Sequence, residues 1–211
     1  MTEALKSRPR RRRQPLRRLT LFLMRIGISG EIVAVTGMAL GILAGAAFMG
    51  TGEASRPDVF WSAALIMSVL RILCIRLDHH FRPLAASQYH DEVFFSELPE
   101  RVSDAMTLIG FGFAVDSNPW LGLAAALAAI FSAYISSIAY SRGAGRKTAF
   151  SGPMNRVNRL IILSVTSLLM IFGISNERLS TPIPEVALWV IVIGCVATVL
   201  IRWIRLREIK V

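Results

Sequence analysis

Three acidic residues in the middle of the chain have the spacing of one helical face. Glu97, Glu100 and Asp104 stand at positions i, i+3 and i+7, which an α-helix brings to the same side. An apolar stretch follows Asp104, and this order predicts that its carboxylate lies at or below the boundary of a membrane. A carboxylate at that depth is costly unless it is paired, protonated or bound to a metal. The spacing therefore indicates a site, although Arg101 also allows a plain salt bridge with Glu97.

Two polar segments flank this face. Residues 78–98 combine acids with histidines, and residues 141–158 combine basic residues with glycines. Carboxylate oxygens suit a hard divalent cation, and arginine suits the oxygens of phosphate. Together the segments predict the handling of a metal-bound phosphate or diphosphate at a membrane surface. The alternatives are charges that are simply solvated and, for the basic segment, contact with lipid headgroups.

The hydrophobic composition predicts the elements that position these segments. Of the 211 residues, 54% are hydrophobic and 18% are charged, whereas about a quarter of the residues of a soluble domain are charged. The apolar residues gather in long runs, as in helices that cross a bilayer. We therefore predict an all-α integral membrane protein with six transmembrane helices. They are expected at residues 32–49, 59–77, 99–115, 120–140, 160–174 and 186–201.

The segment before the first run predicts an amphipathic helix that lies in the membrane interface. Over residues 15–29, Arg17, Arg18 and Arg25 share one side, and the opposite side is apolar. The expected domains are a basic leader with this juxtamembrane helix at 1–31, a six-helix membrane domain at 32–204 and a basic cytoplasmic tail at 205–211.

The distribution of basic residues predicts the orientation. With the N-terminus inside, cytoplasmic segments hold 21 of the 24 Lys and Arg residues, and the outer loops hold only Arg56 and Arg178. This asymmetry predicts that both termini are cytoplasmic, which requires an even number of spans. It also explains the net charge of +10 without a nucleic-acid partner.

Some residues within the runs are expected to serve packing. Gly37, Gly41 and Gly45 recur every fourth residue, which predicts a flat helix face for a close neighbour. The exception is Arg71, a charge at membrane depth that needs a partner or a water-filled cavity. A single such charge does not favour a transporter.

The acidic face resembles the signature of the CDP-alcohol phosphatidyltransferase family. That signature is D-x-x-D-G-x-x-A-R followed, after a short gap, by G-x-x-x-D-x-x-x-D, across the end of the second helix and the start of the third. Residues 97–105 look like the segment around its last aspartate, and the family spacing counted back from Glu100 reaches Asp78. Residues 150–154, followed by Arg156 and Arg159, are similar to a segment of bacterial members related to phosphatidylglycerophosphate synthases.

The sequence also departs from this signature. Ile75 stands at the first aspartate position, His79 at the first glycine, Ser96 at the third aspartate and Glu100 at the fourth. The expected arginine is shifted by one place, to Arg82.

The resemblance implies transfer of a phosphatidyl or related phosphoalcohol group from a CDP-linked donor to an alcohol, with release of CMP. In the family, aspartates hold one or two divalent metals on the diphosphate, and the last one acts as base on the alcohol. By this resemblance Glu100 is the base, and magnesium or manganese binds to Asp78, Glu97, Glu100 and Asp104. The implied phosphate-binding residues are Arg82, Arg142, Arg146, Lys147, Arg156 and Arg159.

The resemblance also implies partners and a location. These are membrane lipids, a CDP-linked lipid or alcohol substrate, a second copy of the chain as a homodimer, and the bacterial inner membrane. The departures leave a second hypothesis open: a catalytically inactive membrane protein on the same scaffold that binds lipid or a partner protein. Metal-dependent CMP release separates the two hypotheses.

Overall fold

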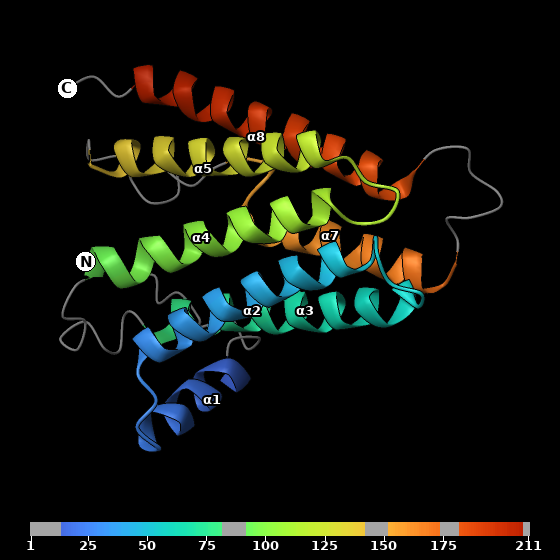
Figure 1. Cartoon of the computed structure of the whole chain (residues 1–211). Helices are drawn as coiled ribbons and strands as arrows, with labels where there is room; N and C mark the ends of the chain where they lie inside the picture. The colour runs from blue at the N-terminus through green and yellow to red at the C-terminus, as the bar shows by residue number, and fades with distance from the viewer. Residues whose placement is uncertain (1–13, 82–91, 142–151, 174–181, 209–211) are drawn as a thin grey trace, which may run out of the picture.

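The computed structural model describes residues 14–81, 92–141, 152–173 and 182–208, and all regular structure in these ranges is helical (Figure 1). The seven helices of these ranges are α1 (Gln14–Arg25), α2 (Gly30–Gly50), α3 (Pro57–Phe81), α4 (Glu92–Gly112), α5 (Pro119–Ser141), α7 (Arg156–Ile171) and α8 (Ile183–Glu208). The all-α class expected from the sequence is therefore confirmed.

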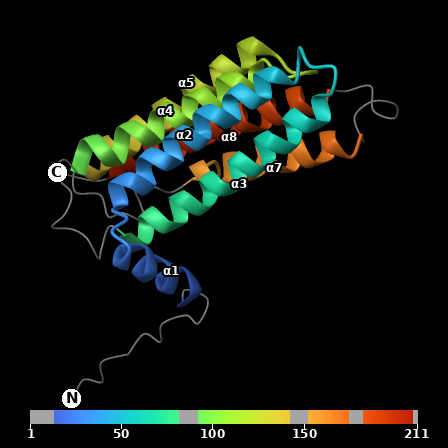
Figure 2. The ribbon, with the colours of Figure 1, turned by 60° about the horizontal axis from the view of Figure 1, so that its bottom comes forward.

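Six of these helices form a closed ring. Packing contacts connect α3 to α2, α2 to α4, α4 to α5, α5 to α8, α8 to α7, and α7 back to α3. Successive helices run in opposite directions, as Figures 1 and 2 show, so the chain passes up and down the bundle. Helix α1 projects from one end and contacts α3. The ring gives the protein an interior that several helices share.

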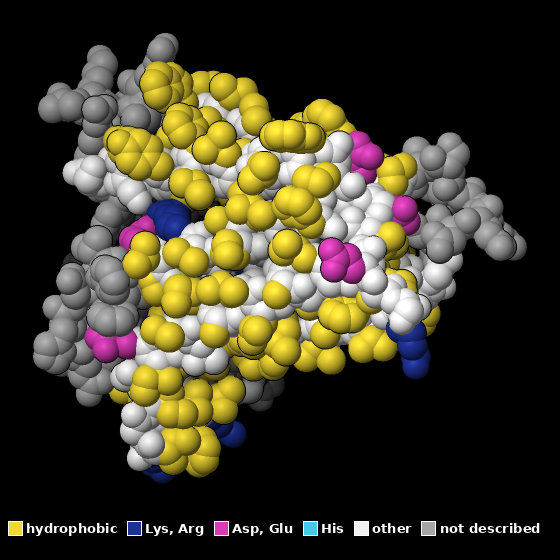
Figure 3. Space-filling model, viewed as in Figure 1, with side chains coloured by type: hydrophobic (Ala, Val, Ile, Leu, Met, Phe, Trp, Pro, Cys, Tyr) yellow, Lys and Arg dark blue, Asp and Glu magenta, His cyan; other side chains and the backbone are white. Residues whose placement is uncertain are grey.

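Four of the described helices are long and apolar enough to cross a membrane. They are α2, α3, the Pro119–Ala139 part of α5 and the Ile183–Arg205 part of α8. Helix α7 has only 16 residues, fewer than the roughly 20 residues of a typical span, and α4 begins with a charged half. Hydrophobic side chains cover much of the face in Figure 3. These helices place the protein in the membrane class.

The start of α4 corrects one expectation. The sequence predicted a helix beginning near Pro99, but α4 begins at Glu92 and Pro99 lies inside it. A proline inside a helix removes one backbone hydrogen bond, yet the helix continues on both sides of it. The acidic residues 97, 100 and 104 therefore belong to one continuous helix.

Close contact between α2 and α4 fixes the position of the acidic helix. A Cβ at Gly45 would lie 2.3 Å from the Met106 carbonyl oxygen, and one at Gly110 would lie 2.2 Å from that of Gly45. Ser103 Oγ also donates a hydrogen bond to the Gly37 carbonyl oxygen at 3.2 Å. The packing role expected for the glycine stripe of α2 is thus confirmed. The helix that packs against Gly41 and Gly45 is α4 of the same chain.

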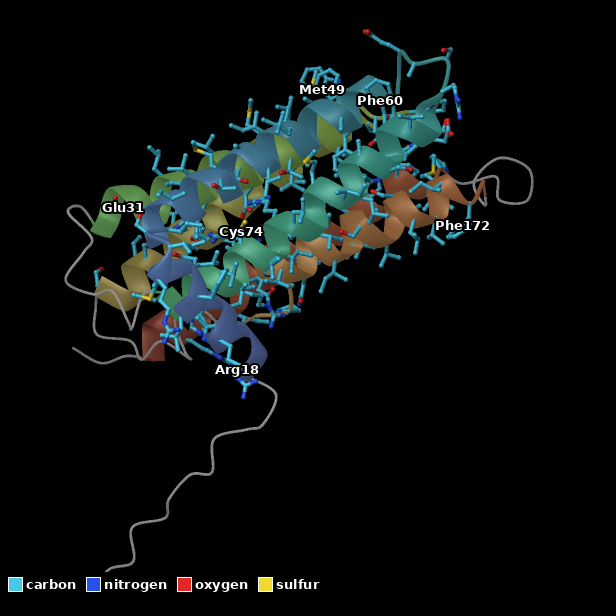
Figure 4. All side chains as sticks on the ribbon, turned by 90° about the horizontal axis from the view of Figure 1, so that it is seen from below. Arg18, Glu31, Met49, Phe60, Cys74 and Phe172 are labelled. Atoms are coloured by element: carbon cyan, nitrogen blue, oxygen red, sulfur yellow. The ribbon has the colours of Figure 1, made fainter. Side chains whose placement is uncertain are left out.

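An aromatic cluster anchors the opposite end of these helices. Phe48, Trp61 and Phe111 are buried and meet edge to face, with ring centroids 4.8–5.9 Å apart. In Figure 4, Met49 and Phe60 mark this end, and Glu31 marks the other. The charged residues described next lie away from the aromatic cluster, toward the end from which α1 projects.

Candidate functional site

The centre of the charged site is Asp104, whose side chain is 7% exposed. Its Oδ1 accepts a hydrogen bond from Arg71 of α3. Its Oδ2 accepts from Arg159 Nη2 at 2.5 Å and from Arg156 Nε at 3.3 Å, both on α7. Arg71 also donates to Thr107 Oγ1 at 3.1 Å. One carboxylate on α4 thus binds three guanidinium groups from two other helices.

Two further carboxylates of α4 are paired with arginine. Glu100, about one helical turn before Asp104, forms an ion pair with Arg156. Glu97 accepts from Arg101, as the sequence allowed, and Arg101 also donates to Ser137 Oγ of α5 at 3.4 Å. All three acids of the predicted face therefore contact guanidinium groups.

The start of α7 holds two of the arginines in place. Asn155 caps the helix, and its Oδ1 accepts from the Asn158 backbone N–H at 2.9 Å. Just before it, the Met154 N–H donates to Thr198 Oγ1 of α8 at 3.0 Å. This capped start places Arg156 and Arg159 in the first turn, where both reach Asp104.

A cavity of about 640 Å³ opens among the ring helices at this end. Residues of α3, α4, α5, α7 and α8 line it. The polar and charged ones are Arg76, Asp78, His79, Glu97, Glu100, Arg101, Ser132, Ser136, Asn155, Arg156, Asn158, Arg159 and Arg202. A smaller cavity of about 30 Å³ borders α2. Ile75 and three charged residues, Asp78, Glu100 and Arg156, line both cavities. These four residues lie where the two spaces adjoin.

The α5–α8 wall contains residues that the sequence did not single out. Arg202 of α8 is buried and donates to the carbonyl oxygen of Ser132 at 2.6 Å and to its Oγ at 2.8 Å. Its place after an apolar run resembles that of an ordinary cytoplasmic tail arginine. The serines at 132 and 136 lie in an alanine-rich run without any distinguishing spacing. Only the fold brings them to the cavity.

Some of the site residues expected from the sequence line the larger cavity, and others do not. Asp78, Glu97, Glu100, Arg156 and Arg159 line the larger cavity, whereas Asp104 is held by arginines beside it. The remaining expected phosphate-binding residues lie outside the described residues: Arg82, Arg142, Arg146 and Lys147.

The described side chains do not fit a metal centre built from three or more protein ligands. No group of three His, Cys, Asp or Glu residues within the described ranges could hold a metal ion. Both oxygens of Asp104 already accept from guanidinium groups, and Glu97 and Glu100 are ion-paired. A divalent cation beside Asp104 would meet the positive charges of three arginines, and repulsion between like charges is strong in a buried site. Asp78 and Glu100 are the two expected ligands that share both cavities.

Comparison with known proteins identifies the fold. No family model and no curated protein matches the sequence. Among solved structures, phosphatidylinositol phosphate synthase of Mycobacterium tuberculosis in complex with manganese and citrate is similar, with a TM-score of 0.68 and 18% identity, over 91% of this chain and 88% of that chain. The same synthase with CDP-DAG bound gives a TM-score of 0.68 and 17% identity, over 91% and 93% of the two chains. Its apo form gives 0.65 and 17%, over 91% and 95%. The chain therefore has the fold of this synthase.

Proposed function

We propose that this chain belongs to the CDP-alcohol phosphatidyltransferase family and transfers a phosphatidyl or related phosphoalcohol group from a CDP-linked lipid to an alcohol. The observation that carries the proposal is the cavity at one end of the shared fold, which Asp78 and Glu100 line together with the arginines of α7. A solved structure with the same fold has CDP-DAG bound. The cavity has the volume and the charges to hold a nucleotide diphosphate.

The proposed reaction is a displacement at phosphorus. The hydroxyl oxygen of the acceptor attacks the phosphorus that carries the lipid, and the bond from that phosphorus to the CMP oxygen breaks. CMP leaves with the electron pair, and Glu100 takes the hydroxyl proton as general base. Arg156 and Arg159 offset the negative charge on the phosphate oxygens. The described residues do not form a three-ligand site for the magnesium or manganese implied by the resemblance, and no step above depends on either ion.

The proposed arrangement in the membrane has six spans and two cytoplasmic termini. Alternating helix directions support it, because α4 and α7 then traverse the same layer as the four apolar helices. The cavity end is the end where the basic segments of the sequence meet the helices. In this arrangement α1 lies in the inner interface, residues 32–204 form the membrane domain, and the bacterial inner membrane is its location.

The test is release of CMP from CDP-DAG by the purified chain, with a panel of alcohols and with magnesium, manganese or EDTA. Replacing Glu100 by glutamine removes the base, so the rate should fall by about 10²–10⁴-fold. Glu53→Gln, an exposed change in the α2–α3 turn, is the control and should keep the full rate. Unchanged CMP release in Glu100→Gln would remove Glu100 from the mechanism.

The inactive scaffold makes a different prediction for the same assay. It should bind CDP-DAG and release no CMP with any alcohol or metal. That outcome would refute the transferase and leave a binding function for the cavity.

A further inference from the structure

The wall of the larger cavity has an excess of positive charge. Among the described residues that line it, five are arginines, Arg76, Arg101, Arg156, Arg159 and Arg202, and three are acids. Immediately behind the wall, the charges of Arg71 and Asp104 offset one another. The ring of apolar helices lowers the local dielectric, which strengthens the attraction of this wall for an anion.

The backbone of α7 adds to this potential. Its first turn, Arg156–Arg159, lines the same cavity, and the N-terminus of a helix carries a partial positive charge of roughly half a unit. This turn is therefore a favourable place for phosphate oxygens, with two guanidinium groups beside it.

Of the four described acids at this site, Glu97, Glu100 and Asp104 are paired with arginine. Asp104 binds three arginines, and the side-chain carboxylates of Glu100 and Glu97 each contact one. Drawing the oxygens of Asp104 onto a metal would break its ion pairs and leave the buried guanidinium groups of Arg71 and Arg159 uncompensated, which is strongly unfavourable.

We propose that this cavity binds the phosphate or diphosphate of its ligand directly through arginine, without a divalent cation. Guanidinium groups pair with phosphate oxygens through two parallel hydrogen bonds and carry a fixed charge. They therefore neutralise the diphosphate in the place of a metal. The identity of the ligand as a CDP-linked molecule rests on the proposed function, whereas the metal-free binding of phosphate does not.

Titration calorimetry on the purified full chain in detergent tests this inference on the wild type. Pyrophosphate should bind in EDTA, and CDP should bind with the same affinity, within about threefold, in EDTA and in manganese. Electron paramagnetic resonance should show that manganese added alone stays free in solution. Manganese held by the protein, or CDP binding at least about tenfold tighter with manganese, overturns the inference.

Two variants locate the site. Arg156→Lys keeps the charge and loses the paired hydrogen bonds, so pyrophosphate should bind about tenfold more weakly. Arg76→Gln, on the exposed side of α3, weakens binding with little risk to folding. Arg56→Gln, at the other end of α3 and paired with Asp58, is the matched control and should bind as the wild type does. Equal binding by all four proteins would contradict the inference.

The outcomes separate this inference from the proposed function. Pyrophosphate bound in EDTA, without CDP binding or CMP release, supports the arginine site and refutes the transferase. CMP release that needs manganese supports the transferase and refutes metal-free binding. Failure of pyrophosphate to bind in EDTA refutes the inference whatever the enzyme assay shows.

Discussion

Asp104 is a single buried carboxylate among three guanidinium groups. Taking ions out of water costs several kcal/mol each, and the cost is offset only when their partners and hydrogen bonds are in place. Arg71, Arg156 and Arg159 meet this condition from α3 and α7. The arrangement stabilises the native packing chiefly by making the loss of any partner expensive.

Replacing Asp104 by asparagine should therefore destabilise the protein strongly. The amide keeps the size of the side chain but leaves the buried Arg71 and Arg159 without their counterion, at a cost of about 3–5 kcal/mol. The midpoint of thermal unfolding, followed by tryptophan fluorescence in detergent, should fall clearly below that of the wild type. Asp116→Asn, an exposed change in the α4–α5 turn, should leave the midpoint unchanged. Equal midpoints for both variants would argue against the ion-pair network.

At the residue scale, the sequence predicts which charged residues require a buried partner, but it does not predict which residue that partner is. The charge of Arg71 within an apolar run predicts a buried partner, and the depth of Asp104 predicts the same. Their pairing spans 33 residues of sequence, and that of Asp104 with Arg159 spans 55. No local spacing rule reaches so far, because the fold alone decides which helices are neighbours. Arg202 lacked even a local signal, since tail arginines are common after a span.

The contact of α2 with α4 is the feature that positions the acidic helix. Glycine at 45 and 110 lets the two backbones approach until no Cβ fits between them. The stripe on α2 is thus covered within the monomer, and a homodimer would have to use another face.

Gly45→Ala should separate these helices slightly and weaken the fold. The added methyl would meet the backbone of Met106 at 2.3 Å, so the overpacking cost of about 1–3 kcal/mol exceeds the gain in helix propensity of about 1 kcal/mol. Its control is Ala46→Val, which enlarges the exposed neighbour on α2. A lower thermal midpoint for Gly45→Ala alone is expected. The α2–α4 contact would be in question if Ala46→Val lowered the midpoint as much.

The boundaries of helices with long apolar runs are predicted from the sequence more accurately than those of helices with polar ends. The runs that predicted α2, α3 and α5 lie within the observed helices. The start of α4 was missed by seven residues because proline favours a first turn but does not require one. Helix α8 continues to Glu208, past the end of its apolar run, because α-helix hydrogen bonding does not depend on hydrophobicity.

The whole molecule is a ring with one charged end. Helices of alternating direction bring the end of α3, the start of α4, the start of α7 and the end of α8 to the cavity. Segments far apart in the sequence therefore share one surface. Five described arginines line the cavity at this end, which the positive-inside rule predicts to be cytoplasmic: Arg76, Arg101, Arg156, Arg159 and Arg202.

Accessibility labelling of single cysteines in cells should confirm this orientation. In a chain with Cys74 and Cys195 replaced, cysteine at Glu53 should react with an impermeant reagent added outside. Cysteine at Gly145 should react only after the membrane is opened. Reaction of the cysteine at 145 in intact cells would overturn the six-span topology with cytoplasmic termini.

The arginine partners of Asp104 become available at different times during synthesis of the chain. Arg71 precedes Asp104 by 33 residues, but Arg159 follows it by 55. At about 5–20 residues per second, the ribosome needs roughly 3–11 s to add those 55 residues. During this interval Arg71 is the only one of the three described arginine partners of Asp104 that has already been made. In the proposed six-span arrangement, insertion of α4 therefore depends on its earlier neighbour α3. The later helix α7 completes the neutralisation of Asp104, and α8 then closes the ring.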